Sequence, residues 1–274
     1  MELERQTVGT CEWLFEHDTF ARWANELTPG MLWIRGASST GKSVAMASAI
    51  AKLISMNANM RVRHYDTIYF FCSQVANDTN RTGYTAILRS FLFQLWRLTK
   101  DDAQLTETWN AIRLDAGKPG ILDSEPHKWK YWSKMLHCVV GALSKLTYII
   151  VDAVDECDKP EDLLSELHKL VDRHDRVKIL FSSRPDIVDL AEFMEDIPTI
   201  TIVENITNKD MSRHIRTVLE AAAPALKRWS FTFTEEFGRE IENTLIEKAD
   251  GMYDPEPKYS MDADLLGFSG QVGT

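Results

Sequence analysis

The sequence lacks several features that would assign it to a specialised class of protein. It has no apolar run near the roughly 20 residues that a membrane helix needs, and its first residues form neither a basic nor an apolar leader. Its four cysteines include no CxxC pair, so neither a disulfide framework nor a cysteine-rich metal site is indicated. We therefore expect a cytoplasmic protein with reduced thiols and no membrane partner.

Positive charge is also scarce. The 31 Lys and Arg residues are outnumbered by 41 Asp and Glu, which gives a net charge of −10. A protein that coats nucleic acid needs clustered cations, so we expect no nucleic-acid partner. The lysines at 128, 130 and 134 stand among aromatic residues, but this pattern is more typical of an amphipathic helix with a solvated basic face. No GxSxG, HExxH or Cys–His signature is present.

What the chain does contain is an alternation of short apolar runs and longer amphipathic stretches. Five runs predict strands, which end near Arg35, Cys72, Asp152, Phe181 and Val203. Helical spacing predicts helices over 42–56, 84–98, 129–143, 160–171, 207–222 and 235–249, whereas 101–127 look less regular. Strands separated by helices indicate an α/β fold with a mostly parallel sheet, whose ligands bind beyond the carboxyl ends of the strands.

The same pass along the chain predicts three parts. Residues 1–30 are a lead-in helix or linker, and residues 31–250 are the nucleotide-binding domain described below. Residues 251–274 break the helical pattern with Pro255 and Pro257 and show little periodicity, so we expect a loosely ordered tail.

The most specific motif is a phosphate loop. A predicted strand ends at Gly36 and a predicted helix begins at Lys42, and the residues between them fit the pattern GxxxxGK[ST]. The glycines let the backbone wrap a phosphate, and the start of the helix presents its positive dipole end to the same anion. Lys42 would reach the β- and γ-phosphates, and Ser43 would ligate Mg²⁺. The candidate nucleotide-binding residues are Gly36, Ala37, Ser38, Ser39, Thr40, Gly41, Lys42 and Ser43.

A second motif follows the apolar strand 147–152. The strand ends in Asp152, a carboxylate that would hold Mg²⁺, and Asp155 and Glu156 follow just beyond it. Either of these two acids could orient or deprotonate an attacking water. A solvated acidic loop is the alternative interpretation of these residues. An EF-hand is excluded because the alternating aspartates and the central glycine are missing.

A third motif follows the strand 177–181. Arg184 comes directly after Ser182 and Ser183, where a side chain can reach a γ-phosphate and report whether it is present. A solvated loop arginine is the alternative interpretation.

Together these segments resemble a known family. The lead-in 9–14, the strand and loop 32–43, and the segments 69–72, 86–90, 151–157 and 182–185 are similar to the NACHT domain of fungal NOD-like receptors. That domain belongs to the nephrocystin-like N-terminal P-loop group of the STAND class of NTPases. A small residue after the Mg²⁺ aspartate, here Ala153, followed by two acids is the hallmark of the family. The resemblance spans roughly residues 8–253.

The resemblance implies a five-stranded parallel sheet in the order 5-1-4-3-2 and a signalling switch that binds ATP or GTP and hydrolyses it slowly. It also implies homo-oligomers or pairing with related full-length receptors. Three features depart from the family. Ser38 and Ser39 replace the glycine often found in mid-loop, which would weaken binding if that position needs a positive φ. We expect no effector domain before residue 31 and no apolar helix of a following winged-helix module, so the sequence looks like a truncated receptor, a short isoform or an incomplete gene model.

Two other functions remain open at this stage. The chain could be a catalytically inactive interaction module that pairs with full-length relatives, as the missing winged helix would favour. A small-molecule kinase built on the same loop is less favoured, because no basic lid segment is recognisable. The preference between ATP and GTP, the upstream signal, the effector partner and the oligomeric state have no signature in the sequence.

Overall fold

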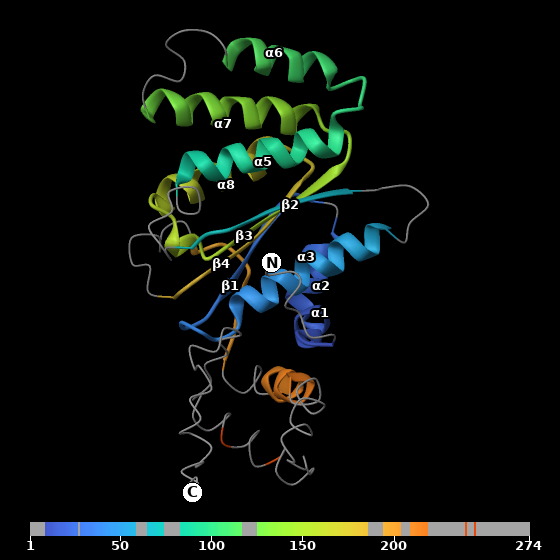
Figure 1. Ribbon diagram of the computed structural model, residues 1–274, viewed down its shortest axis with the longest axis vertical. Helices are drawn as coiled ribbons and strands as arrows, with labels where there is room; N and C mark the ends of the chain where they lie inside the picture. Colours follow the sequence, from blue (N-terminus) through green and yellow to red (C-terminus); the bar gives the residue numbers. More distant parts are fainter. Residues whose placement is uncertain are drawn as a thin grey trace, which may run out of the picture.

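One parallel sheet organises the protein. The computed structural model describes residues 9–26, 28–58, 65–73, 83–116, 125–185, 194–203 and 209–218, with Arg239 and Thr244. Within these ranges five strands pair in the order β2-β3-β4-β1-β5, and every pairing is parallel (Figure 1). The predicted α/β class and the strand order 5-1-4-3-2 are confirmed. The strands are β1 Gly30–Arg35, β2 Tyr65–Phe71, β3 Leu146–Asp152, β4 Val177–Ser183 and β5 Thr199–Thr201.

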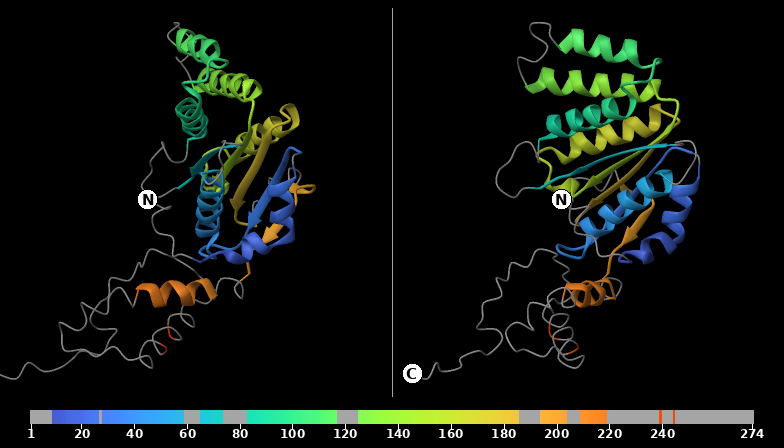
Figure 2. Two further views of the ribbon diagram at one scale, coloured as in Figure 1. Left: turned by 90° about the vertical axis from the view of Figure 1, so that its right-hand side faces the viewer. Right: turned by 45° about the vertical axis from the view of Figure 1, so that its right-hand side comes forward.

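Helices cover both faces of this sheet (Figure 2). On one face lie α1, α2 and α3, and on the other lie α5 and α8, with α7 and then α6 stacked beyond α5 (Figure 1). The helices are α1 Glu12–Glu16, α2 Asp18–Asn25, α3 Lys42–Ala58, α5 Tyr84–Thr99, α6 Thr106–Ala116, α7 Glu125–Ala142 and α8 Pro160–Arg173, and a 3-10 turn, η3, spans Val154–Glu156.

The two hydrophobic clusters explain why the strands read as continuous apolar runs. Successive side chains of a strand point to opposite faces, so a strand covered on both sides is apolar at every position. In β1, Leu32 and Ile34 pack toward α3, whereas Met31 and Trp33 pack in the cluster that holds α5 and α8. β4 is buried along its whole length. The core therefore holds the carboxyl ends of these strands rigidly in place.

The lead-in segment is part of this core. Phe20 and Trp23 of α2 are buried with residues of β1 and α3. Lys178 of β4 is 1% exposed, and its ammonium donates to the Trp23 carbonyl oxygen and lies 5.8 Å from the centre of the Trp23 ring. Burial lowers the pKa of Lys178, and the charge of Glu26 opposes that shift. Helix α2 thus supplies the carbonyl that makes a buried lysine tolerable within the sheet.

Within the described residues, one side chain pairs with the edge of β2 that faces away from β3. Gln94 of α5 donates from Nε2 to the Tyr69 carbonyl at 2.7 Å, and its Oε1 accepts from the Tyr69 N–H at 3.1 Å. A carboxamide has one donor and one acceptor side by side, so it reproduces the pair of bonds that a neighbouring strand would make.

The structure differs from the sequence-based expectation between residues 101 and 127. This region was expected to be less regular, but α6 spans Thr106–Ala116 and α7 begins at Glu125 rather than at 129. The expectation was wrong because α6 has only a narrow apolar stripe: Trp109 and Ile112 are its residues packed against the core cluster. The Tyr131 hydroxyl also donates to the Ile112 carbonyl at 2.8 Å and ties α6 to α7.

The structure confirms some of the smaller predictions about the ends of elements and corrects others. β5 ends at Thr201 rather than near residue 203, and β4 continues to Ser183. Residues 209–218 are helical, as predicted for 207–222, whose remaining residues lie outside the described ranges. The tail 251–274 and most of the helix predicted over 235–249 also lie outside them.

All four cysteines are free, as expected. In the described ranges no helix has the length and apolarity needed to cross a membrane.

The aromatic and basic segment at the start of α7 also has a structural role. Tyr131 is buried, and Trp129 and Trp132 pack against the core cluster, whereas Lys130 and Lys134 are exposed. This arrangement is an amphipathic helix with a solvated basic face, as the sequence favoured.

Candidate functional site

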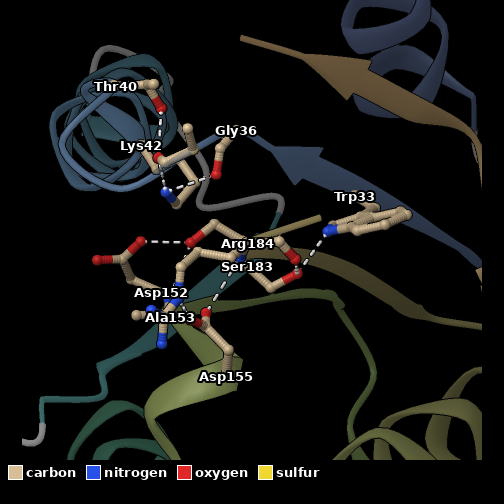
Figure 3. A network of polar contacts seen from close by, with 11 residues as sticks. Trp33, Gly36, Thr40, Lys42, Asp152, Ala153, Asp155, Ser183 and Arg184 are labelled. Atoms are coloured by element: carbon tan, nitrogen blue, oxygen red, sulfur yellow. Dashed lines mark hydrogen bonds and ion pairs between the residues drawn. The ribbon is translucent and has the colours of Figure 1, made fainter. Parts of the chain in front are cut away.

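The loop between β1 and α3 is built around close backbone approaches (Figure 3). At Gly36 a Cβ atom would lie 2.5 Å from the Thr40 hydroxyl oxygen and 3.3 Å from the carbonyl oxygen of Ile202, so only glycine fits. The Thr40 hydroxyl donates to the Ala37 carbonyl at 2.9 Å and closes the turn. Gly41, with φ +86°, directs the chain into α3. This tight strand–turn–helix arrangement is the context that the phosphate-loop motif requires.

Ser39 occupies the strained position in this loop. Its φ is +60°, in the left-handed region that an L-residue with a Cβ adopts at a cost of roughly 1–2 kcal/mol. The condition raised by the sequence, a positive φ where the family often has glycine, is therefore met at Ser39.

We expect Ser39→Gly to raise the melting temperature, because glycine adopts this conformation without strain. The gain should be about 1 kcal/mol, measured by circular dichroism, with tighter nucleotide binding if the loop is thereby pre-organised. Ser38→Gly is the matched control, since the φ of Ser38 is not positive. An equal gain from Ser38→Gly would show that strain at Ser39 is not the cause.

Lys42 begins α3 and folds back over the loop. Its Nζ donates to the carbonyl oxygens of Gly36 at 2.9 Å and Ala37 at 2.6 Å. Burial lowers the pKa of Lys42, and the negative charges of Asp155 and then Asp152 oppose that shift. The ammonium is thus held by neutral carbonyls next to two carboxylates, from which a phosphate oxygen could draw it.

Asp152 ends β3 inside the protein. It is 3% exposed, and the Ser182 hydroxyl donates to its Oδ1. Burial raises the pKa of Asp152, while the hydroxyls of Ser182 and Ser43 and the charge of Lys42 act to lower it. The Ser182 oxygen also accepts from the Ala153 N–H at 2.9 Å, where Ala153 has a φ of +52°. Ser182 therefore fixes both the carboxylate and the turn that follows it.

Ser182 is a site residue to which the sequence assigned no role. Its position was visible, two residues before Arg184, but its function depends on the pairing of β3 with β4. Ser183 also makes a contact between strands, because its hydroxyl oxygen accepts from the indole N–H of Trp33 on β1 at 2.8 Å. Ser182 and Ser183 place two hydroxyls at the end of β4, next to the strand that ends in Asp152. That placement is the sequence signal that could have identified both serines.

Asp155 and Arg184 face one another across the same edge. The Arg184 Nε donates to Asp155 Oδ2 at 2.6 Å, and the Arg184 backbone N–H donates to Asp155 Oδ1 at 3.3 Å. Asp155 and Glu156 are on η3, directly after β3, and Glu156 is partly buried. The sequence predicted both residues for this edge but not their pairing.

The predicted residues thus converge, because β1 pairs with β4 and β4 pairs with β3. The charges that act on Lys42 come from Asp155, Asp152, Arg184 and Glu156, all from the ends of β3 and β4. The donor set fits Mg²⁺, which prefers oxygen ligands, since the Ser43 hydroxyl lies close enough to the Asp152 carboxylate to lower its pKa. In the described residues no group of three or more His, Cys, Asp or Glu could hold a metal by itself, and a nucleotide-bound Mg²⁺ does not require one.

A parallel sheet with this loop, a buried strand-end aspartate and an arginine that faces Asp155 defines a P-loop NTPase-like domain. Residues 9–184 match the family described as Nephrocystin 3, N-terminal, and the chain belongs to that family. The chain is also 25% identical over 185 residues to the vegetative incompatibility protein HET-E-1 of Podospora anserina. That stretch is 66% of this chain and 13% of the relative. The resemblance to a NACHT domain is thereby confirmed.

Solved structures with a similar arrangement include proteins that bind DNA. The Aeropyrum pernix ORC1 protein in complex with DNA has a TM-score of 0.45 and 13% identity, over 97% of this chain and 64% of that one. Drosophila ORC bound to DNA has a TM-score of 0.48 and 14% identity, over 93% of this chain and 61% of that one. The chain therefore spans less than two thirds of these proteins' length.

Proposed function

We propose that the chain is a Mg²⁺-dependent switch that binds ATP or GTP and hydrolyses it slowly, in the manner of the NACHT core of a fungal NOD-like receptor. The observation that carries this proposal is the convergence of Lys42, Asp152 and Arg184 at one edge of the sheet. Residues 31–250 would form the switch, acting in the cytoplasm. Its partners would be the nucleotide, further copies of the chain or related full-length receptors, and neither nucleic acid nor membrane.

Binding begins with the loop and its lysine. The backbone N–H groups of residues 36–43 and the start of α3 receive the phosphates, and the Lys42 ammonium exchanges its two carbonyl partners for β- and γ-phosphate oxygens. Ser43 and Asp152 would hold Mg²⁺, which would supply positive charge to neutralise the phosphates. Ser182 keeps the Asp152 carboxylate oriented toward Ser43.

Hydrolysis needs a carboxylate next to the attacking water. Asp155 and Glu156 are the candidates, and each can accept a proton or orient the water by a hydrogen bond. Arg184 would contact the γ-phosphate and lose that contact when the phosphate leaves. The difference in contacts between the triphosphate and diphosphate states is what would make the domain a switch.

The test measures turnover and binding separately. We expect the native chain to hydrolyse ATP or GTP slowly with Mg²⁺, and Glu156→Gln to reduce turnover about 100-fold while the Kd changes less than about twofold. Glu161→Gln on the exposed first turn of α8 is the matched acid-to-amide control and should behave as native.

The same experiment separates the switch from an inactive interaction module. Turnover that Glu156→Gln removes and Glu161→Gln preserves contradicts the module. Tight binding with no turnover above that of Glu156→Gln would instead favour the module. Absence of binding of either nucleotide by the native chain would overturn the proposed switch altogether.

A further inference from the structure

Asp155 has both of its oxygens occupied by one residue. Oδ2 accepts from the Arg184 Nε at 2.6 Å, and Oδ1 accepts from the Arg184 backbone N–H at 3.3 Å. The Asp155 side chain is 7% exposed, whereas that of Arg184 is 50% exposed. The carboxylate is therefore the buried member of the pair and the guanidinium the exposed one; Figure 3 shows both residues.

This arrangement is poorly suited to water activation by Asp155. A general base must present an oxygen lone pair to the water within hydrogen-bond reach. The two Asp155 oxygens instead face N–H donors that come from the end of β4. Glu156, one residue further along η3, is the other candidate carboxylate for that task.

The pair also lies within electrostatic reach of the phosphate loop. Of the groups that act on the Lys42 ammonium, Asp155 is the strongest charge, ahead of Asp152, and Arg184 opposes both. A γ-phosphate drawn to Lys42 would consequently enter a site where Arg184 already has an anionic partner. A phosphate and a carboxylate are both strong acceptors for a guanidinium, so they compete for it.

We propose that Asp155 is a positioning residue that restrains Arg184, and that the γ-phosphate of a nucleoside triphosphate competes with Asp155 for the guanidinium. The inference rests on the proposed function and names the regulation of the same site. A diphosphate lacks the γ-phosphate and leaves the pair intact. The restraint therefore lowers the affinity for the triphosphate without lowering that for the diphosphate. The ratio of the diphosphate Kd to the triphosphate Kd is consequently smaller than it would be without the pair.

Breaking the pair would also reach Glu156. Asp155 belongs to the three-residue turn Val154–Glu156, whose end is held by the Glu156 N–H donating to the Ala153 carbonyl at 2.9 Å. When the guanidinium of Arg184 moves to the γ-phosphate, the turn loses its ion pair with the end of β4 and keeps the hydrogen bond from the Ala153 N–H to Ser182. The arrival of the γ-phosphate is thereby coupled to the position of the acid beside the water.

The test is a double-mutant cycle on nucleotide preference. Equilibrium affinities for ADP and a non-hydrolysable ATP analogue, or the guanine pair if it binds more tightly, are measured for the native chain, Asp155→Asn, Arg184→Ala and the double variant. We expect Asp155→Asn to raise the ratio of the diphosphate Kd to the triphosphate Kd by about two- to fivefold, the range for a half-exposed ion pair. In the Arg184→Ala background the same substitution should leave the ratio unchanged.

The Arg184→Ala background tests the simplest alternative explanation, a general effect of charge on nucleotide binding. Loss of one negative charge near a polyphosphate strengthens binding by general electrostatics, but that effect persists without Arg184. Asp155→Glu keeps the carboxylate and should return the ratio to within about twofold of native, which a merely structural role would not predict.

Each result bears on the inference. An unchanged or lower ratio in Asp155→Asn, or an equal rise without Arg184, overturns the restraint while the nucleotide-binding function stands. Absence of nucleotide binding by the native chain overturns both. Circular dichroism melting confirms that each variant is folded, and Asp155→Glu supplies the comparison if Asp155→Asn is not.

Discussion

Lys42→Ala should weaken binding of ATP and GTP by at least about 100-fold. The ammonium is the one cation within the loop itself, and a charge-assisted hydrogen bond to a partly buried phosphate is worth about 3 kcal/mol, where each 1.4 kcal/mol is tenfold in Kd. The Gly36 carbonyl, which accepts from Lys42, also loses that donor in the variant, whereas the Ala37 carbonyl still accepts from the Thr40 hydroxyl. Equilibrium binding of labelled ATP and GTP, with and without Mg²⁺, measures the loss.

The matched control for this substitution lies on the same helix. Lys52 of α3 is exposed, and its ammonium lies 5.3 Å from the centre of the Phe15 ring, near the opposite end of α3 from the loop. Lys52→Ala removes the same charge and should leave the Kd unchanged. Equal losses in the two variants would mean that net charge, and not the loop, determines binding. An unchanged Kd in Lys42→Ala would refute the proposed site.

Asp152→Asn should raise the stability of the folded protein and at the same time abolish the effect of Mg²⁺ on nucleotide binding. Burial is the largest influence on the Asp152 carboxyl and raises its pKa, so the ionised form is disfavoured in the folded protein relative to the unfolded chain. A neutral amide of the same shape avoids that cost. We expect the variant to melt at least about 2 °C higher at pH 7, while Mg²⁺ no longer strengthens nucleotide binding.

The difference in melting temperature between Asp152→Asn and the native chain should depend on pH. Because the folded-state pKa lies above the unfolded value of 3.8, the folded protein binds the proton more tightly, and stability from this group falls as pH rises through the raised pKa. The asparagine does not titrate. The difference in melting temperature should therefore be largest at neutral pH and shrink as pH falls toward 3.8.

Two outcomes would count against this account. A variant less stable than native at pH 7 would mean that the Lys42 charge and the Ser43 and Ser182 hydroxyls outweigh burial at this carboxylate. Retention of the Mg²⁺ effect on binding would remove Asp152 from the metal site. Asp162→Asn is a suitable control, since that exposed acid on α8 lies outside the site.

The arrangement of strand ends was accessible from the sequence because it follows from local pattern. The apolar runs before Gly36 and up to Asp152 mark buried parallel strands, and the loop motif needs only a strand before it and a helix after it. The strand order came from the family resemblance and is confirmed by the pairing of β1 with β4 and β5. Residues at the ends of such strands must meet at one edge.

The contacts within that edge were not accessible in the same way. Asp155 and Arg184 are 29 residues apart, and no pattern shows that they pair with each other rather than with solvent or phosphate. Ser182 became visible only through the register of β4 against β3. Helix α6 was missed because its burial is slight, and periodicity reports burial.

The carboxamide of Gln94 on Tyr69 limits how copies of this chain can assemble. An exposed strand edge is a template for cross-β stacking, in which further strands add by backbone hydrogen bonds alone. At β2 such an addition would first have to displace two hydrogen bonds from Gln94, and at the other edge of the described sheet β5 offers the three residues Thr199–Thr201. Within the described residues, the sheet is therefore a poor template for adding strands from a second copy and building a fibril.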